Sequence, residues 1–147
     1  MSAVTRTWRL SHSVERVWHA LTDREELAAW LMPNDFAPQV GHRFTLRGGG
    51  ALGLPAVVYC EVLEIHPPHR LVLAWSERPG PAETEVELTV RRVGDHTELR
   101  IHHRVTADVR MRAGREPQAW DWGDDVRRAL GATLERSGGD ARREVTL

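Results

Sequence analysis

The most informative absence in this sequence is lysine, because all 20 basic side chains among its 147 residues are arginine. A chain without lysine has no amine side chain for Schiff-base catalysis, for general-base catalysis or for the phosphate contact of a P-loop. Cysteine is almost as scarce, since Cys60 stands alone and has no internal partner for a disulfide. This cysteine usage suits a reducing compartment.

Long apolar runs are also absent. No segment approaches the roughly 18 consecutive apolar residues of a membrane-spanning helix, and residues 1–10 lack the apolar stretch of a secretory signal. The expected location is therefore cytoplasmic, with no membrane partner. The 20 basic and 21 acidic groups are interleaved along the chain and give a net charge of −1, so we expect no concentrated basic face and no nucleic-acid partner.

The residues that are present have the composition of a globular protein, 41% hydrophobic and 28% charged. A chain of this length suits one folded domain, and no internal repeat or linker interrupts it. We expect a single domain over residues 1–147, with a core at about 4–137 and a tail at 138–147.

The N-terminal part predicts a strand followed by two short helices. Residues 4–10 include side chains that strands favour. Ser13 is a good N-cap for a first amphipathic helix. Thr22 has capping-box spacing with Glu25 at the start of a second helix, which Pro33 is expected to end.

In the middle of the chain the hydrophobic period changes from about 3.6 to about 2, which is typical of consecutive antiparallel strands. Val86 and Leu99 are expected on the buried face, and Glu87 and Arg100 on the solvent face. The expected strands, with a weaker one first, lie at about 36–40, 42–47, 56–66, 70–76, 83–92 and 97–106.

A helical period returns near Pro117 and continues to about Ser137, where Gly138 and Gly139 are expected to end the helix. Its apolar stripe consists of Ala119, Trp122, Val126, Leu130 and Leu134. The sheet and this helix can bury their apolar faces together only if the sheet curves around the helix. The predicted fold is therefore α+β, a curved antiparallel sheet of about six or seven strands wrapped around a long C-terminal helix.

Several stretches of this sequence are similar to those of a known superfamily. They are residues 13–23, Trp30-Leu31-Met32-Pro33, residues 40–44, 61–65, Pro67-Pro68, Arg70-Leu71, Trp75, residues 97–103, and Trp122 with Leu130 and Leu134. Over about residues 4–137 the chain resembles the START-like (SRPBCC, helix-grip) superfamily, most closely the branch similar to the C-terminal domain of the activator of heat-shock protein 90 ATPase.

The resemblance implies a deep cavity between the sheet and the long helix. Different members use such a cavity for lipids, hormones, polyketides or other apolar molecules. The superfamily also includes cyclases, hydrolases and co-chaperone domains, so the resemblance does not imply one chemistry.

Tryptophan is abundant, with six residues in the chain. Trp30, Trp75 and Trp120 are candidates for the walls of a ligand pocket. Trp122 is a further ligand-binding candidate, although core packing is the favoured explanation of both Trp122 and Trp18.

The most interesting polar residue is His103, because strand alternation places it on the same face as Leu99 and Ile101. An inward histidine could act as a general base or bind the polar end of a ligand, but a lone inward histidine is more often a hydrogen-bonded structural residue, and we favour that interpretation. The sequence identifies no carboxylate partner for it.

Tyr59 and Glu61 share a parity on the 56–66 strand and are further ligand-binding candidates if that parity faces inward. The apolar residues Val58, Cys60 and Val62 occupy the other parity, so the direction stays open.

No metal or cofactor is expected. His66 and His69 flank a turn that offers no third ligand, and His102 and His103 point to opposite faces of a strand. The glycines of residues 48–53 have the spacing of a dinucleotide-binding loop, but the next predicted element is a strand and not a helix. A flexible loop, which could gate a pocket, is the better interpretation.

Three functions remain open. The first is binding of a small apolar ligand, and the second is a co-chaperone-like role with a chaperone as partner. The third is a cyclase- or hydrolase-type enzyme in which His103, with Tyr59 or Glu61, moves protons. No catalytic residue is assigned, because no hydroxyl or thiol lies in a nucleophile motif. The sequence does not predict the oligomeric state.

Overall fold

The structure is a computed structural model that describes residues 3–48, 56–106 and 119–146, with the backbone alone for 137–146. Most of the glycine-containing loop at 48–53 therefore lies outside the described residues. The element order is β1 (Ala3–Leu10), α1 (Val14–Thr22), α2 (Arg24–Trp30), β2 (Arg43–Arg47), β3 (Val57–His66), β4 (Arg70–Ser76), β5 (Thr84–Val93), β6 (His96–Val105) and α3 (Asp124–Thr146).

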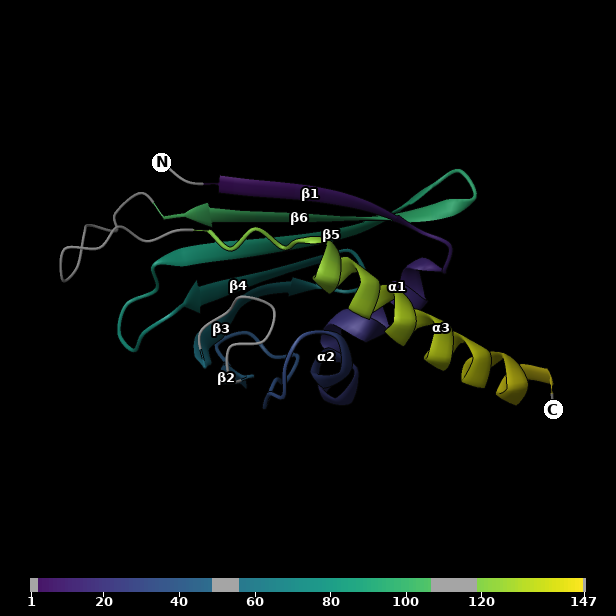
Figure 1. Cartoon of the computed structure of the whole chain (residues 1–147), viewed down its shortest axis with the longest axis horizontal. Coiled ribbons are helices and arrows are strands. Elements are labelled where there is room, and N and C mark those ends of the chain that lie inside the picture. Colours follow the sequence, from purple (N-terminus) through teal and green to yellow (C-terminus); the bar gives the residue numbers. More distant parts are fainter. Residues whose placement is uncertain (1–2, 49–55, 107–118, 147) are drawn as a thin grey trace.

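The strands form one antiparallel sheet in the order β1-β6-β5-β4-β3-β2, and the three helices lie over one side of it (Figure 1). Helices α1 and α2 belong to the connection that carries the chain from β1, at one edge, to β2 at the other. This arrangement confirms the predicted fold, a curved antiparallel sheet with a long C-terminal helix.

Residues 36–40 form no strand, although the sequence predicts a weak one there. The preceding residues instead cover the edge of β2. The Asp35 carboxylate accepts a hydrogen bond from the Thr45 amide at 2.9 Å, and the Arg47 amide donates to the Pro33 carbonyl at 2.9 Å. The edge strand thus has part of its backbone paired without a seventh strand.

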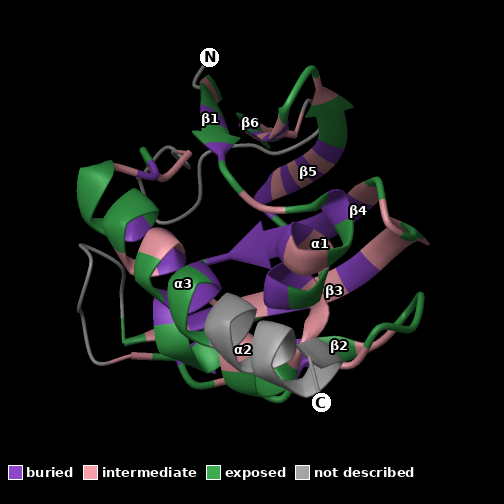
Figure 2. Ribbon diagram, turned by 90° about the vertical axis from the view of Figure 1, so that its right-hand side faces the viewer, coloured by how far each residue is buried: buried purple, intermediate pink, exposed green. Residues whose placement is uncertain are grey.

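Alternating burial along the strands divides the sheet into an apolar inner face and a charged outer face, and β5 shows this as alternating bands in Figure 2. Val86 and Leu99 are buried, as predicted. On the outer face Arg104 contacts Glu85 at 2.7 Å, and Arg70 contacts Glu87 at 2.7 Å. Oppositely charged side chains on neighbouring strands therefore cover the face that looks away from the helices.

The two short helices occur where expected, but one of them begins differently. The Ser13 hydroxyl accepts from the Arg16 amide at 3.0 Å, which confirms it as the N-cap of α1. The N-cap of α2 is Asp23 and not Thr22, since the Asp23 carboxylate accepts from the Glu26 amide at 3.0 Å. Thr22 still belongs to α1, and its hydroxyl donates to the Trp18 carbonyl.

Both ends of the long helix differ from the prediction. It begins at Asp124, after a non-helical segment in which Trp122 has a positive φ of 49°, and it continues to Thr146 through Gly138 and Gly139. The predicted tail is therefore largely helical.

Val126, Leu130 and Leu134 are buried as expected, and α3 packs beside α1 and α2. Within the described residues, none of the helices has both the length and the apolar character needed to cross a membrane.

Candidate ligand-binding site

An apolar cavity lies between the helices and the inner face of the sheet. Its lining contains no exposed polar atom. The walls are Leu21 from α1, Leu27 and Trp30 from α2, Leu31 and Phe36 after it, Phe44 and Leu46 from β2, Leu71, Leu73 and Trp75 from β4, Leu88 from β5, and Trp122 before α3. The cavity measures about 20 Å³, which is room for about one water molecule.

Three of the predicted tryptophans line this cavity, namely Trp30, Trp75 and Trp122. The Trp30 indole donates its N–H to the Ala20 carbonyl at 2.8 Å, and the Trp122 indole donates to Nδ1 of His103 at 2.9 Å. Among the described residues, the buried indole nitrogen of Trp75 has no hydrogen-bond partner. Trp75 is thus the cavity tryptophan whose polar atom is unsatisfied.

Trp120, also a predicted site residue, lies outside the cavity wall and packs against it. Its ring stacks on Trp75 with centroids 6.2 Å apart and planes 12° apart, and its centroid is 4.7 Å from that of Trp122. The Trp75 ring also meets His103 edge-on at 5.4 Å. Trp75 is therefore held between aromatic neighbours, which restrict its orientation.

His103 faces inward, as strand alternation predicts, and it is fully buried. Its Nδ1 accepts from the indole of Trp122 and from the backbone amide of Trp120, at 2.9 and 3.2 Å. This leaves the proton on Nε2, which donates to the Thr84 hydroxyl at 2.9 Å. Burial lowers the pKa of His103 to about 4, so the side chain is neutral at pH 7 and hydrogen-bonded on both nitrogens.

Tyr59 and Glu61 lie on the outer face of the sheet, which corrects the possibility that they face the interior. The inward parity of β3 belongs to Val58, Cys60 and Val62, which are buried. Tyr59 and Glu61 instead line an open groove of about 570 Å³ with Arg43, Ser76 and the 79–82 turn. A catalytic pairing of either residue with His103 is excluded, because the sheet separates them.

The thiol of Cys60 is a further chemistry-bearing group near the core. Burial raises the pKa of the Cys60 thiol well above its usual range, so the thiolate form is suppressed. Among the described residues, no three or more histidine, cysteine, aspartate or glutamate side chains gather where they could hold a metal ion.

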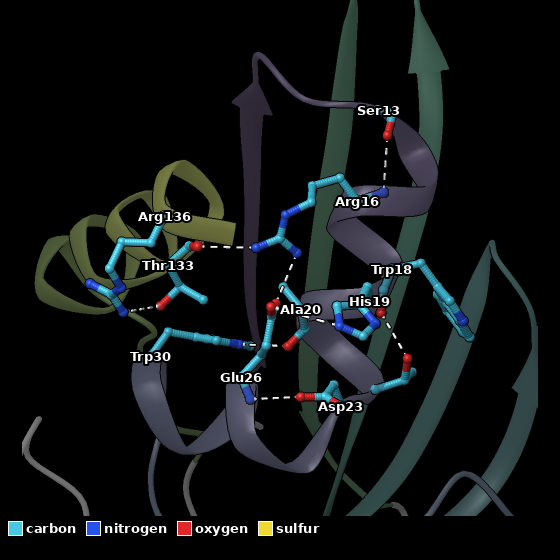
Figure 3. A network of polar contacts seen from close by, with 11 residues as sticks. Ser13, Arg16, Trp18, His19, Ala20, Asp23, Glu26, Trp30, Thr133 and Arg136 are labelled. Atoms are coloured by element: carbon cyan, nitrogen blue, oxygen red, sulfur yellow. Dashed lines mark hydrogen bonds and ion pairs between the residues drawn. The ribbon is translucent and has the colours of Figure 1, made fainter. Parts of the chain in front are cut away.

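A network of polar contacts joins the three helices (Figure 3). Arg16 of α1 donates to Glu26 of α2 at 2.8 Å and to the carbonyl of Thr133 in α3 at 3.0 Å. The two charged side chains are only 10% and 13% exposed. Together with the Trp30–Ala20 hydrogen bond, these contacts fix α1, α2 and α3 relative to one another.

The sequence interpretation did not identify the aliphatic and phenylalanine part of the wall. Phe36 and Phe44, the only phenylalanines of the chain, meet edge to face at 5.2 Å and both line the cavity. Alternation with Leu46 marks Phe44 as inward. Nothing in a single sequence separates a residue that lines a cavity from one that fills the core.

Comparison with known proteins finds solved structures of similar fold. No curated protein matches the chain significantly. Among solved structures, protein MLL2253 from Mesorhizobium loti is 28% identical with a TM-score of 0.62, and the match covers 92% of this chain and 88% of that one. Protein BH1534 from Bacillus halodurans is 21% identical with a TM-score of 0.67, over 91% of this chain and 97% of that one. The Aha1 dimer from Colwellia psychrerythraea is 18% identical with a TM-score of 0.62, over 96% of each chain.

The solved structures below 25% identity show only a shared fold, whereas the match to a family model identifies the family. The model of the family described as Activator of Hsp90 ATPase homolog 1-like protein matches residues 11–135. This span includes the two short helices, all strands after β1 and the buried part of α3. The chain therefore belongs to the Activator of Hsp90 ATPase homolog 1-like family.

Proposed function

We propose that this protein binds a small, largely apolar molecule between its helices and its sheet. The observation that supports this function is the cavity wall, in which twelve apolar residues from both layers surround one space. Sites for small molecules in proteins are concave, predominantly apolar and supplied with few polar groups. The resemblance to the START-like superfamily also supports the proposal, because some members of that superfamily bind apolar molecules between the sheet and the long helix.

The cavity is too small to hold an organic ligand without a change in its walls. A cavity of about 150 Å³ holds a molecule such as benzene, whereas the cavity here measures about 20 Å³. Binding therefore requires its walls to move apart.

Trp122 is the wall residue whose movement we expect to open the cavity. Its φ of 49° costs roughly 1–2 kcal/mol for a bulky L-residue. Movement of Trp122 breaks its hydrogen bond to His103. Release of the backbone strain offsets the free energy that is lost with this bond.

Small-molecule binding agrees better with the described residues than the two alternatives do. An enzyme that uses His103 would need that group to reach a ligand, but both of its nitrogens are hydrogen-bonded within the protein and it does not line the cavity. A co-chaperone role would need a docking surface, and among the described residues Val40 is the only large apolar side chain that is well exposed. Stimulation of a cognate chaperone ATPase by the purified protein would restore the second alternative.

A thermal-shift screen against apolar metabolites, with native mass spectrometry of the hits, tests the proposal. We expect hits to raise the melting temperature of the wild-type protein, because a ligand that binds only the native state stabilises it. The variant Leu88→Phe fills the cavity from β5 and should lose the shift. Leu99→Phe is the matched control, since Leu99 is also buried, on β6, but does not line the cavity.

Circular dichroism must first show that both variants are folded, because overpacking costs about 1–3 kcal/mol. Hits that stabilise Leu88→Phe as much as wild type bind elsewhere and contradict the proposal. The complete absence of hits among apolar compounds contradicts it as well.

A further inference from the structure

We infer that β1 pairs with the β1 strand of a second copy of this chain, so that one antiparallel sheet continues across a two-fold symmetric dimer. This inference concerns the outer edge of the sheet and is independent of the cavity. It follows from an open strand edge, from the groove beside that edge and from the side chains on both.

The two edges of the sheet differ in how far they are covered. At the β2 edge, the Thr45 amide donates to the Asp35 carboxylate and the Arg47 amide to the Pro33 carbonyl. At the opposite edge, all eight residues of β1 pair with β6 without a bulge. Among the described residues, no group outside β6 forms a hydrogen bond with the β1 backbone, and Figure 1 shows no described element beyond β1. An uncovered edge of this kind is a template for another strand.

The register of the sheet shows which backbone groups of β1 are unpaired. Successive residues of a strand direct their N–H and C=O groups to opposite sides, towards one neighbouring strand and then the other. The Thr106 amide, directly after β6, donates to the Glu83 carbonyl, directly before β5. The even-numbered residues of β6 therefore bond to β5, and the odd-numbered ones, such as Ile101, bond to β1.

Because Ile101 lies opposite Arg6, the even-numbered residues of β1 form the ladder with β6. The odd-numbered residues direct their N–H and C=O groups to the open edge, and they are Ala3, Thr5, Thr7 and Arg9.

A groove of about 670 Å³ lies beside this edge. Residues 5–8 of β1 form one wall, and residues 121–124 with Arg127, around the start of α3, form the other. Consecutive strand residues point to opposite faces of a sheet, so a groove that contacts four of them in succession follows the edge and not one face. The groove therefore gives an added strand room beside β1.

The sequence of β1 is suited to pairing with itself. Pairing centred on Thr7 places this residue opposite Thr7 of the second copy and Arg9 opposite Thr5, so that no two arginines face each other. It also joins odd-numbered residues to odd-numbered residues, as the unpaired N–H and C=O groups require. The two-fold axis forms every contact twice.

The groove wall carries charges that complement those of the added strand. The Asp121 and Asp124 carboxylates form no ion pair within the described part of the chain. The strand β1 has two arginines and no acidic residue. In the antiparallel pair the inner faces of both copies lie on the same side, so Arg6 of each copy stands on the side where the other copy carries these carboxylates.

An inward-pointing charge can protect a sheet edge from pairing, but Arg6 is held in another way. Its Nε donates to the Asp121 carbonyl at 2.8 Å. The guanidinium is thus directed towards the start of α3, and the backbone edge remains accessible.

Sedimentation equilibrium of the purified protein over a range of concentrations tests the inference, and we expect a monomer–dimer equilibrium. Thr7→Pro removes an N–H that points to the open edge and leaves the ladder between β1 and β6 in place, because proline is tolerated on that side of an edge strand. The dissociation constant should rise about tenfold or more, since the symmetric pair loses two hydrogen bonds.

Thr7→Val is the matched control, because it also removes the hydroxyl but keeps the backbone N–H. Its dissociation constant should be close to that of wild type. Equal constants for Thr7→Pro and wild type overturn the inference, because the dimer then forms elsewhere. A wild-type protein that stays monomeric at every concentration overturns it as well and leaves the edge for a strand of another protein.

Hydrogen exchange of the wild-type protein, followed by NMR, covers the case in which Thr7→Pro does not fold. The amides of Thr5 and Thr7 should be protected in concentrated solution and exchange rapidly after dilution, because they lose their partner strand. The amides of Arg6 and Trp8 should stay protected by β6 at both concentrations. The same response to dilution at all of these amides would overturn the inference.

Discussion

The imidazole of His103 illustrates how a residue that suggests catalysis in the sequence can have a structural role. Its inward direction follows from alternation with Leu99 and Ile101 and is confirmed. Its partners, an indole, a backbone amide and a hydroxyl, come from positions that no motif connects with it. Protonation would place a hydrogen on Nδ1, against two N–H donors, in addition to the cost of burying the charge.

The first prediction concerns the pH dependence of stability. The pKa of His103 falls from an ordinary 6.5 to about 4, so the unfolded chain binds a proton at this site before the native chain does. The free energy of unfolding should therefore decrease as the pH falls from about 6.5 to about 4, by roughly 3 kcal/mol from this group. Urea unfolding at a series of pH values measures this change.

Two variants isolate this contribution. His103→Gln should lack this component of the pH profile. His102→Gln should keep most of it, because burial is the main cause of the lowered pKa of His103 and the charge of His102, on the outer face, is a smaller one. Parallel profiles for wild type and His103→Gln would contradict the assignment.

The direction of Tyr59 and Glu61 shows where residue-level prediction from the sequence ends. The register of β3 against β4 shifts between Val62 and Glu64, so the parity of the strand changes within its length. Ile65 then packs against the core although it shares the parity of Tyr59. Both parities thus carry apolar residues, and simple alternation cannot indicate which of them faces inward.

At the scale of single elements, local signals located the helices better than they located their ends. Thr22 and Asp23 are adjacent possible caps, and the Thr22–Glu25 spacing favoured the wrong one. In the structure the Asp23 carboxylate caps α2 while its backbone amide donates to His19 at the end of α1. One residue therefore serves both helices.

The second prediction tests this cap. Asp23→Ala should lower the free energy of unfolding by about 1 kcal/mol, the usual value of an N-cap side chain. Glu25→Ala removes the other half of the capping box expected from the sequence, and it should cost less than about 0.5 kcal/mol as an exposed substitution. Chemical denaturation of the two variants distinguishes the caps, and a larger loss in Glu25→Ala would favour the capping box.

The start of α3 differs from the prediction because tertiary contacts outweigh periodicity. The backbone amide of Trp120 and the indole of Trp122 are both used by His103, in a segment that precedes the helix. A periodicity of apolar residues does not contain this information. The two glycines at 138 and 139 each cost about 1 kcal/mol in a helix relative to alanine, but they do not end α3.

The third prediction concerns the network that joins the helices. Arg16→Met removes the closest cation from the nearly buried Glu26 and the donor to the Thr133 carbonyl. Breaking a buried pair in this way should cost roughly 3 kcal/mol. The double variant Arg16→Met/Glu26→Leu should recover most of the loss, because it leaves no uncompensated charge.

Arg91→Met is the control, since the Arg91–Glu98 pair lies on the surface with Arg91 69% exposed. Its loss should cost less than about 1 kcal/mol. Equal costs for Arg16→Met and Arg91→Met in denaturant titrations would show that the network does not hold the helices.

At the scale of the whole molecule, the order of elements was sufficient to predict the architecture. One strand, two short helices, consecutive antiparallel strands and a long amphipathic helix leave few ways to bury every apolar face. The volume of the interior could not be predicted in this way. It depends on how twelve wall residues interdigitate, which is a matter of close packing and not of pattern.

The tryptophan cluster also gives the molecule an optical signal of its own. Trp75, Trp120 and Trp122 lie with ring centroids 4.7 to 6.2 Å apart and in fixed relative orientations. Electronic transitions of chromophores this close couple with one another, so the near-ultraviolet circular dichroism should contain a strong tryptophan band. Trp120→Phe should weaken this band sharply, whereas Trp18→Phe, which changes a ring of α1 that has no such aromatic contact among the described residues, should not. A molecule that separates Trp122 from Trp75 would change the same band, so its binding could be followed without any added label.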